Sequence, residues 1–270
     1  MVLGTTGFSS LKEMDAAVGV AIDAGVRGFD TSRFYHTGGR STEKCLGKVL
    51  HGKLRSGAIK REELFVTTKI AIPQMIRGGI ARDVEASARD LRLDYIDCVL
   101  LHWPFPGYYI SAYKALEAVQ ARGIVKTLGM SNCRERHFEA LYQSKLSQLP
   151  AVHQMERHPL CSEEDVVRYC LDRGMVVQAY SPLGKMMGDL AGNAQLSAIA
   201  ANYNKTVAQV IIRWHLDTGV VPVFRSKTPS RIRENLDVFD FNLSGGDIEA
   251  IDRMNRDHKL CTESIRCPGY

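Results

Sequence analysis

Short runs of apolar and β-branched residues alternate along this chain with longer stretches in which apolar residues recur every three or four positions. Eight runs have the length of a strand, and they are Val2–Thr5, Arg27–Thr31, Glu63–Lys69, Asp97–Trp103, Val125–Ser131, Val152–Glu156, Val176–Ser181 and Val220–Ser226. The stretches between them have the period of an amphipathic helix, most clearly at Ile80, Val84, Ala88 and Leu91. The pattern therefore predicts eight strand–helix units in succession.

Strands that alternate with helices pair in parallel through right-handed crossovers. Eight such units in 270 residues are typical of an α/β protein with a (β/α)8 TIM barrel. An open doubly wound sheet would carry G-x-G-x-x-G after a strand, and no predicted strand is followed by it. The stretch from Gly47 to Leu54 comes close to a P-loop, but it lacks the hydroxyl residue and lies in a helical stretch. We therefore expect one barrel domain over residues 1–270, with a short C-terminal tail.

Charge and cysteine content narrow the class of partner. The net charge of +5 is scattered, and only the stretch from Arg225 to Arg233 is locally basic, which favours a small phosphorylated ligand over nucleic acid. The seven cysteines are odd in number and widely spaced, so they indicate neither a metal site nor a disulfide framework. With no segment that could span or target a membrane, we expect a cytoplasmic monomer with no membrane partner.

The ends of the predicted strands carry the candidate chemistry. Catalytic groups of a barrel gather at the carboxyl ends of its strands. Asp30, Lys69 and His102 lie at three such ends, and Tyr35 follows Asp30 by five residues. Each of them alone has an ordinary structural explanation. Together they predict a site in which a lysine ammonium lowers the pKa of a phenol, while a carboxylate holds the lysine charged.

Ordered motifs from Leu3 to Leu243 resemble the aldo-keto reductase family, including its prostaglandin F synthase-like and 2,5-diketogluconate reductase-like members. The matching stretches are Leu3-Gly4-Thr5, Gly28-Phe29-Asp30-Thr31 with Tyr35, Thr67-Thr68-Lys69, His102-Trp103-Pro104, Gly129-Met130-Ser131-Asn132, Gln154 with Glu156, Tyr180-Ser181-Pro182-Leu183-Gly184, and Arg225-Ser226 with Arg231, Glu234 and Asn235. The resemblance implies NADPH-dependent reduction of a small-molecule carbonyl. Tyr35 would then be the proton donor, supported by Asp30 and Lys69, and His102 would orient the carbonyl oxygen.

The same resemblance implies the residues that bind NADPH or NADP+. Ser131, Asn132 and Gln154 would hold the carboxamide, because paired donors and acceptors suit a planar amide. Tyr180 would stack on the nicotinamide. The remaining expected cofactor residues are Thr5, Ser181, Leu183, Arg225, Ser226, Lys227, Arg231, Glu234 and Asn235. Thr228 is a plausible N-cap before Pro229, and a helix start flanked by two arginines suits the 2′-phosphate. No metal site is expected.

Several positions depart from the family pattern. The N-terminal hairpin that precedes the family's barrel is absent or minimal, and an inserted Gly38-Gly39 loop beside Tyr35 could form a small lid. Thr6 and Ala71 stand where aromatic residues are common, which implies a wider pocket. Trp103, Tyr108 and Tyr109 remain as its candidate walls.

Two other functions remain open. A non-catalytic NADPH-binding regulatory subunit would keep the cofactor residues, although it would not need the four candidate catalytic groups. A barrel isomerase or glycosidase would need no nicotinamide, and a glycosidase would need two carboxylates across the cleft, for which Asp30 and Glu156 are the pair available.

Overall fold

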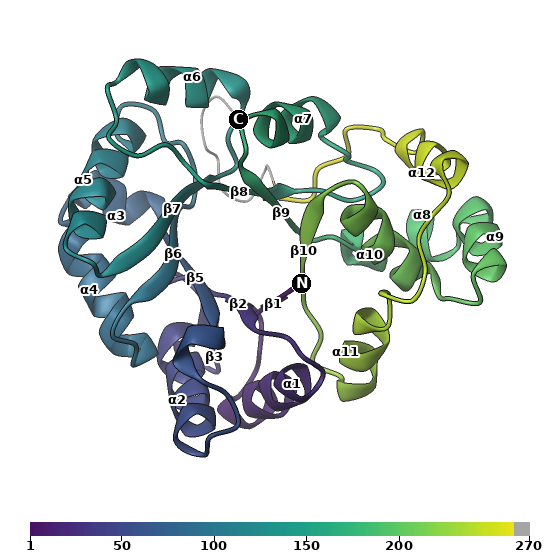
Figure 1. Ribbon diagram of the computed structural model, residues 1–270, viewed down its shortest axis with the longest axis horizontal. Helices are drawn as coiled ribbons and strands as arrows, with labels where there is room; N and C mark the ends of the chain where they lie inside the picture. The colour runs from purple at the N-terminus through teal and green to yellow at the C-terminus, as the bar shows by residue number, and fades with distance from the viewer. Residues whose placement is uncertain (262–270) are drawn as a thin grey trace.

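The computed structural model describes residues 1–261, and they form the predicted barrel (Figure 1). Eight parallel strands close in the order β1-β10-β9-β8-β7-β6-β5-β2. These strands are β1 (Val2–Gly4), β2 (Gly28–Asp30), β5 (Phe65–Ile70), β6 (Ile96–Leu101), β7 (Val125–Ser131), β8 (Val152–Glu156), β9 (Val176–Tyr180) and β10 (Val220–Phe224). Each of the eight predicted runs overlaps one barrel strand, and only β5 and β6 extend one residue beyond the predicted bounds, at Ile70 and at Ile96. The last nine residues of the predicted tail, with Cys267, lie outside the described residues.

Helices surround the barrel and follow its strands in the expected alternation (Figure 1). They are α1 (Leu11–Asp23), α2 (Thr42–Arg55), α3 (Ile72–Arg77), α4 (Ile80–Leu91), α5 (Tyr109–Ala121), α6 (Glu135–Gln143), α7 (Glu164–Asp172), α8 (Gly188–Ala191), α9 (Ala194–Asn202), α10 (Val207–Asp217), α11 (Pro229–Leu236) and α12 (Gly245–Asp252), with short 3-10 turns η1 (Arg61–Glu63) and η2 (Gly184–Met186). The predicted stripe Ile80, Val84, Ala88 and Leu91 is buried along α4. The stretch that resembles a P-loop lies within α2 and not after a strand. Its Gly47 has a packing role, because a Cβ there would overlap the backbone of Asp90 and Leu91.

The closure of the barrel explains why its strands are apolar along their whole length. Parallel strands covered by helices are buried on both faces, and all six residues of β6 are buried. The N-terminal strand β1 completes the ring by pairing with β10 on one side and β2 on the other, with Val2 opposite Val223 and opposite Gly28. This pairing brings the β1–α1 and β10–α11 loops to the same rim.

The insertion after Tyr35 folds as a two-stranded antiparallel hairpin, β3 (His36–Thr37) and β4 (Arg40–Ser41). Both turn glycines have positive φ, 53° at Gly38 and 74° at Gly39, which suits a tight hairpin turn. A Cβ on Gly38 would lie 2.6 Å from the carbonyl oxygen of Ser9. The hairpin therefore packs closely on the β1–α1 loop.

Two further observations concern the cysteines and the helices of the described residues. The six described cysteines are free, and five of them are buried. Among residues 1–261, no helix has the length and apolar character required to cross a bilayer.

Candidate active site

Asp30, Lys69 and Tyr35 meet at the carboxyl end of the barrel. Parallel pairing of β2 with β5 places Asp30 opposite Thr67, two residues before Lys69. The Lys69 ammonium donates to both Asp30 carboxylate oxygens at 2.6 and 2.7 Å and to the Thr31 carbonyl oxygen at 3.0 Å. The Lys69 Nζ lies 5.3 Å from the centre of the Tyr35 ring. Three of the four predicted catalytic groups are thus in contact.

The pKa of Tyr35 corrects one expectation. Burial raises it above the ordinary value for tyrosine, and the nearby Lys69 charge opposes that effect without overcoming it. The expectation that Lys69 lowers the pKa of Tyr35 below its normal value is therefore wrong for this structure. The lysine still favours the phenolate relative to an equally buried phenol without a cation.

His102 completes the cluster from the next strand. It follows the end of β6, and its ring centre lies 6.1 Å from that of Tyr35 in an edge-on arrangement. Burial, together with the Lys69 charge, lowers the pKa of His102 to about 3. The imidazole is therefore neutral near pH 7, and a neutral imidazole can donate one N–H hydrogen bond to a carbonyl oxygen.

A buried polar network lies beside the ion pair. The Gln154 amide nitrogen donates to Asp30 at 2.8 Å and to the Gln178 side-chain oxygen at 2.9 Å. Gln154 and Gln178 face each other in the register of β8 and β9. Gln154 thus supports Asp30, and its side-chain oxygen is the atom available to accept a bond from a cofactor. Gln178 is a site residue that sequence reasoning missed, although a single glutamine in the apolar run 176–180 was a signal.

The end of β7 carries the expected carboxamide residues. Ser131 and Asn132 are buried, and Asn132 has a left-handed φ of 60°. The Asn132 amide donates to the His102 carbonyl oxygen at 2.9 Å, and its oxygen accepts from the Tyr180 hydroxyl at 2.8 Å. Tyr180, at the end of β9, is half-buried and therefore keeps part of its ring accessible.

Basic side chains gather where β10 leads into α11. Arg225, Lys227, Arg231 and Arg233 are exposed. Pro229 occupies the first helical position, as predicted, and Thr228 occupies the N-cap position but makes no side-chain cap hydrogen bond. The free N–H groups at a helix start and the nearby guanidinium groups are the chemistry that binds a phosphate dianion. These residues fit the 2′-phosphate of NADP(H).

Other expected cofactor residues have additional roles within the protein. The Thr5 hydroxyl donates to the Asp30 carbonyl oxygen at 2.9 Å, which ties β1 to the site. Lys227 pairs with Glu13 at 3.4 Å, and the Glu234 carboxylate accepts from Thr206 at 3.0 Å. Of the remaining expected cofactor residues, Ser181 and Leu183 follow β9. Ser226 and Asn235 belong to the segment from β10 to the end of α11, and Asn235 is buried.

The expected pocket walls differ in their exposure. Thr6 and Tyr108 are exposed, and Tyr108 packs on Phe105 with ring centres 5.8 Å apart. Trp103 is buried, with 3 % of its surface exposed. Tyr109 is wrong as a wall, because its buried ring lies in the packing between α5 and α6, against His137. Tyr109 is the first residue of α5, and a side chain at the start of a helix can point toward the neighbouring helix instead of toward the active site.

Glu156 does not pair with Asp30 in the way a glycosidase would require. Its carboxylate accepts backbone N–H bonds from Leu260 and Cys261 at 2.6 and 3.1 Å. Both oxygens are therefore occupied by the chain itself. This contact with the C-terminal segment was not expected from the sequence.

Comparison with known proteins agrees with the motifs and the geometry. The model of the aldo/keto reductase family matches residues 1–256. An uncharacterized oxidoreductase of Bacillus subtilis, YtbE, is 35% identical over 96% of this chain and 89% of its own length. The glyoxal reductase of Bacillus subtilis gives the same values, and the methylglyoxal reductase DkgA of Yersinia pestis is 33% identical over 93% of this chain and 87% of its own length.

Solved structures share the fold across nearly the whole chain. A Bombyx mori aldo-keto reductase in complex with NADP superposes with a TM-score of 0.89 at 29% identity, covering 97% of this chain and 91% of that one. An aldo-keto reductase enzyme from a Medee basin deep-sea metagenome library gives a TM-score of 0.88 at 33% identity, covering 97% and 93%.

Proposed function

The chain belongs to the aldo/keto reductase family, and we propose that it is an NADPH-dependent reductase of small carbonyl compounds with Tyr35 as general acid. The observation that carries the assignment is the buried Lys69 ammonium, which binds both oxygens of Asp30 and lies 5.3 Å from the centre of the Tyr35 ring. A protein that only bound NADPH would have no use for an ordered cation beside a phenol. The retained group therefore favours catalysis over a regulatory subunit.

Each of the four candidate catalytic residues would have its own role in the reduction of the carbonyl. The bound nicotinamide supplies the hydride that reduces the carbonyl carbon. Tyr35 donates its proton to the carbonyl oxygen as negative charge develops there, and Lys69 stabilises the phenolate that remains. His102 donates an N–H hydrogen bond to the same oxygen and fixes its direction. Asp30, held by Gln154, keeps Lys69 charged and in place.

The cofactor would span from the barrel centre to the basic rim. Ser131, Asn132 and Gln154 would hold the carboxamide, and Tyr180 would lie on the nicotinamide ring. Ser181 and Leu183 would contact the pyrophosphate region, and the residues from Arg225 to Asn235 would bind the adenosine end. The relatives named as glyoxal and methylglyoxal reductases favour small aldehydes with a neighbouring carbonyl as substrates.

Turnover with simple aldehydes tests the assignment directly. We expect enzyme-dependent loss of NADPH absorbance with methylglyoxal and with 4-nitrobenzaldehyde, because the proton donor, its support and the cofactor residues are all in place. Binding of NADPH, followed by quenching of tryptophan fluorescence, separates the two candidate functions. Quenching without any turnover across a broad carbonyl panel would favour the regulatory subunit.

Cofactor preference should depend on Arg225 and Arg231. Replacing both with alanine removes two charge-assisted contacts to phosphate, each contributing about 1.5–3 kcal/mol. We expect the Kd for NADPH to rise at least about tenfold, since 1.4 kcal/mol is one decade in affinity, while the Kd for NADH hardly changes. Arg253→Ala, which removes an exposed basic residue just after α12 and outside this segment, is the matched control. An equal loss for both cofactors would place the 2′-phosphate elsewhere.

A further inference from the structure

A fully buried arginine follows β8 without a carboxylate partner. Arg157 has 0 % of its surface exposed, and its Nη2 nitrogen has no hydrogen-bond partner among the described residues. No acidic side chain of residues 1–261 forms an ion pair with it, and Glu164 and Asp252 act on it only through longer-range charge. Burial lowers the pKa of Arg157 to about 10, so the guanidinium is charged at neutral pH. Because an unpaired buried charge is costly to a fold, we expect Arg157 to have a role.

The contacts of Arg157 fix its guanidinium and join it to a second loop. Nε donates to the Ser162 carbonyl oxygen at 2.9 Å, and the central carbon lies 3.7 Å from the centre of the Trp214 ring. Nη1 lies 3.0 Å from Nδ1 of His215 in α10. His215 is also fully buried, and its Nε2 lies 3.1 Å from the Pro182 carbonyl oxygen. Arg157 and Pro182 are thus connected through one imidazole.

The two partners of His215 determine its tautomer. A guanidinium can only donate hydrogen bonds, and a carbonyl oxygen can only accept them. Nδ1 of His215 must therefore accept from Arg157, and Nε2 must carry the proton that is donated to Pro182. Burial and the Arg157 charge hold the pKa of His215 well below its ordinary value, so the imidazole is neutral, as this arrangement requires. Arg157 thus determines which nitrogen of His215 donates.

The bond from His215 orients a peptide in the segment that follows β9. We call residues 181–187 the β9–α8 segment. Its peptides are trans, and in a planar trans peptide the C=O and N–H groups point in opposite directions. The Pro182 C=O points to His215, so the N–H of Leu183 points away from it. Because no hydrogen bond among residues 1–261 uses that N–H, it is a free donor held in a fixed direction.

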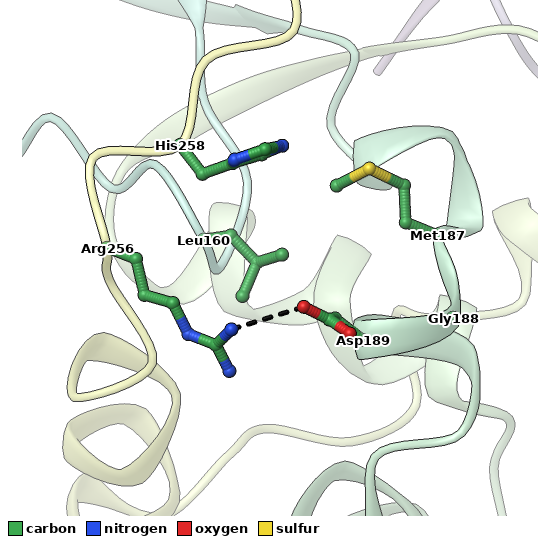
Figure 2. A pocket seen from close by; sticks show the side chains of 6 residues that line it. All are labelled: Leu160, Met187, Gly188, Asp189, Arg256 and His258. Carbon is green, nitrogen blue, oxygen red and sulfur yellow. Dashed lines mark hydrogen bonds and ion pairs between the residues drawn. The ribbon is translucent and has the colours of Figure 1, made fainter.

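The rest of the β9–α8 segment is strained and has little support at its outer end. Ser181, Lys185 and Met186 have left-handed φ values of 49°, 55° and 50°, which L-residues adopt only when their surroundings enforce them. At the outer end, Met187 and the start of α8 line a cavity of about 300 Å³ instead of packing against a neighbouring element (Figure 2). The position of the segment therefore depends on its inner attachment.

We propose that Arg157 and His215 are positioning residues for the pyrophosphate of the cofactor, because together they hold the Leu183 N–H in the direction that binds it. Both side chains are fully buried, so they act through the β9–α8 segment and not by contact with the cofactor. The negative charge of the pyrophosphate also complements the Arg157 cation. This role rests on the proposed function, since it requires that NADPH binds at the β9–α8 segment.

The binding of two ligands separates this role from a general loss of structure. NADPH carries the pyrophosphate, whereas adenosine 2′-monophosphate carries only the phosphate expected at the basic end of the site. Arg157→Met keeps the length of the side chain and removes its charge and donors. We expect this change to raise the Kd for NADPH, measured by calorimetry, at least about tenfold, and to leave the Kd for adenosine 2′-monophosphate almost unchanged. Val84→Ala, which shortens a fully buried side chain of α4, is the matched control and should leave both values as they are.

Two replacements of His215 test the hydrogen bonds themselves. His215→Gln keeps one acceptor and one donor in the side chain, so both bonds can be preserved. His215→Leu fills a similar space and has neither group. We expect the His215→Gln variant to bind NADPH nearly as tightly as the wild type, and the His215→Leu variant to lose affinity as Arg157→Met does. In turnover, the KM for NADPH should rise in the weakened variants while kcat stays close to that of the wild type, because Tyr35 and Lys69 are unchanged.

Nitrogen NMR of the histidine rings tests the relay without any ligand. In isotope-labelled protein, long-range couplings between ring protons and nitrogens distinguish an imidazole protonated at Nε2 from one protonated at Nδ1. The signals that disappear in His215→Gln identify His215. We expect a neutral ring with its proton on Nε2, and a proton on Nδ1 would contradict the proposed relay.

Unchanged affinity for NADPH in folded Arg157→Met would overturn the proposal, and so would an equal loss of affinity for both ligands. Thermal melting shows whether each variant is folded. Should Arg157→Met fail to fold, the contrast between His215→Gln and His215→Leu decides the question with the same two ligands. Failure of the wild type to bind NADPH would instead refute the proposed function itself, while the NMR experiment would still report on the relay.

Discussion

Replacing Tyr35 with phenylalanine should lower kcat by about 10²–10⁴-fold, the usual contribution of general acid catalysis. Phenylalanine keeps the ring that packs edge-on against His102, so the shape of the site is preserved and only the proton donor is lost. The loss should lie near the upper end of that range, because the neighbouring Lys69 is committed to Asp30 and Thr31. Affinity for NADPH should hardly change.

The measurement needs hydride transfer to limit the rate. A deuterium isotope effect with NADPH labelled at the transferred position establishes this for the wild type, since slow release of cofactor would hide a chemical defect. Single-turnover rates then compare wild type with Tyr35→Phe directly. A variant that keeps more than about a tenth of the wild-type rate would contradict the acid-catalysis estimate.

The ion pair between Lys69 and Asp30 should affect stability as strongly as it affects catalysis. Both side chains are almost fully buried. Asp30→Asn leaves the Lys69 ammonium without a counter-charge, which typically costs about 3–5 kcal/mol. Lys69→Met leaves the Asp30 carboxylate with its bond from Gln154, and it also removes the cation that favours the phenolate. Each variant should be less stable in urea and nearly inactive.

The double variant separates the two effects. With both charges removed, no unpaired charge is left in the barrel, so Asp30→Asn/Lys69→Met should unfold at a higher urea concentration than either single variant, yet remain inactive. Recovery of activity along with stability would show that Lys69 has no role in proton transfer. Stability losses that simply add would show that the two charges do not act as a pair.

The same pair gives a pH dependence whose sign is fixed by Lys69. Asp30 raises the pKa of Lys69 above its ordinary value despite the opposing effect of burial. The stabilisation is fully present below the unfolded pKa of about 10.4 and is lost as the pH rises through the higher folded value. The free energy of unfolding of the wild type should therefore fall more steeply above about pH 10.4 than that of the double variant.

The barrel could be predicted from the sequence because its determinants are local. A strand buried on both faces is a short apolar run, and a covering helix has an apolar stripe, so the alternation of the two is visible without any long-range information. The candidate catalytic groups were also predictable, since a barrel brings the ends of its strands to one face. Lys69 and Asp30, 39 residues apart, meet for this reason.

What could not be predicted depends on contacts that no local pattern encodes. Gln154 reaches Asp30 across 124 residues, and Glu156 meets Leu260 across 104. The small hairpin after Tyr35 has strands of only two residues, too short to show alternation. The net pKa of Tyr35 depends on how far burial outweighs one cation, and that balance requires three-dimensional geometry.

Two residues of the proposed cofactor site have backbone conformations that L-residues adopt rarely. Asn132 has a φ of 60° and Ser181 a φ of 49°. Such conformations cost of order 1–3 kcal/mol each and persist only when the surroundings enforce them. Glycine would relieve this strain at Ser181 and would also remove the hydroxyl proposed to contact the pyrophosphate. Selection for thermal stability would therefore favour glycine at position 181, whereas selection for turnover would favour serine.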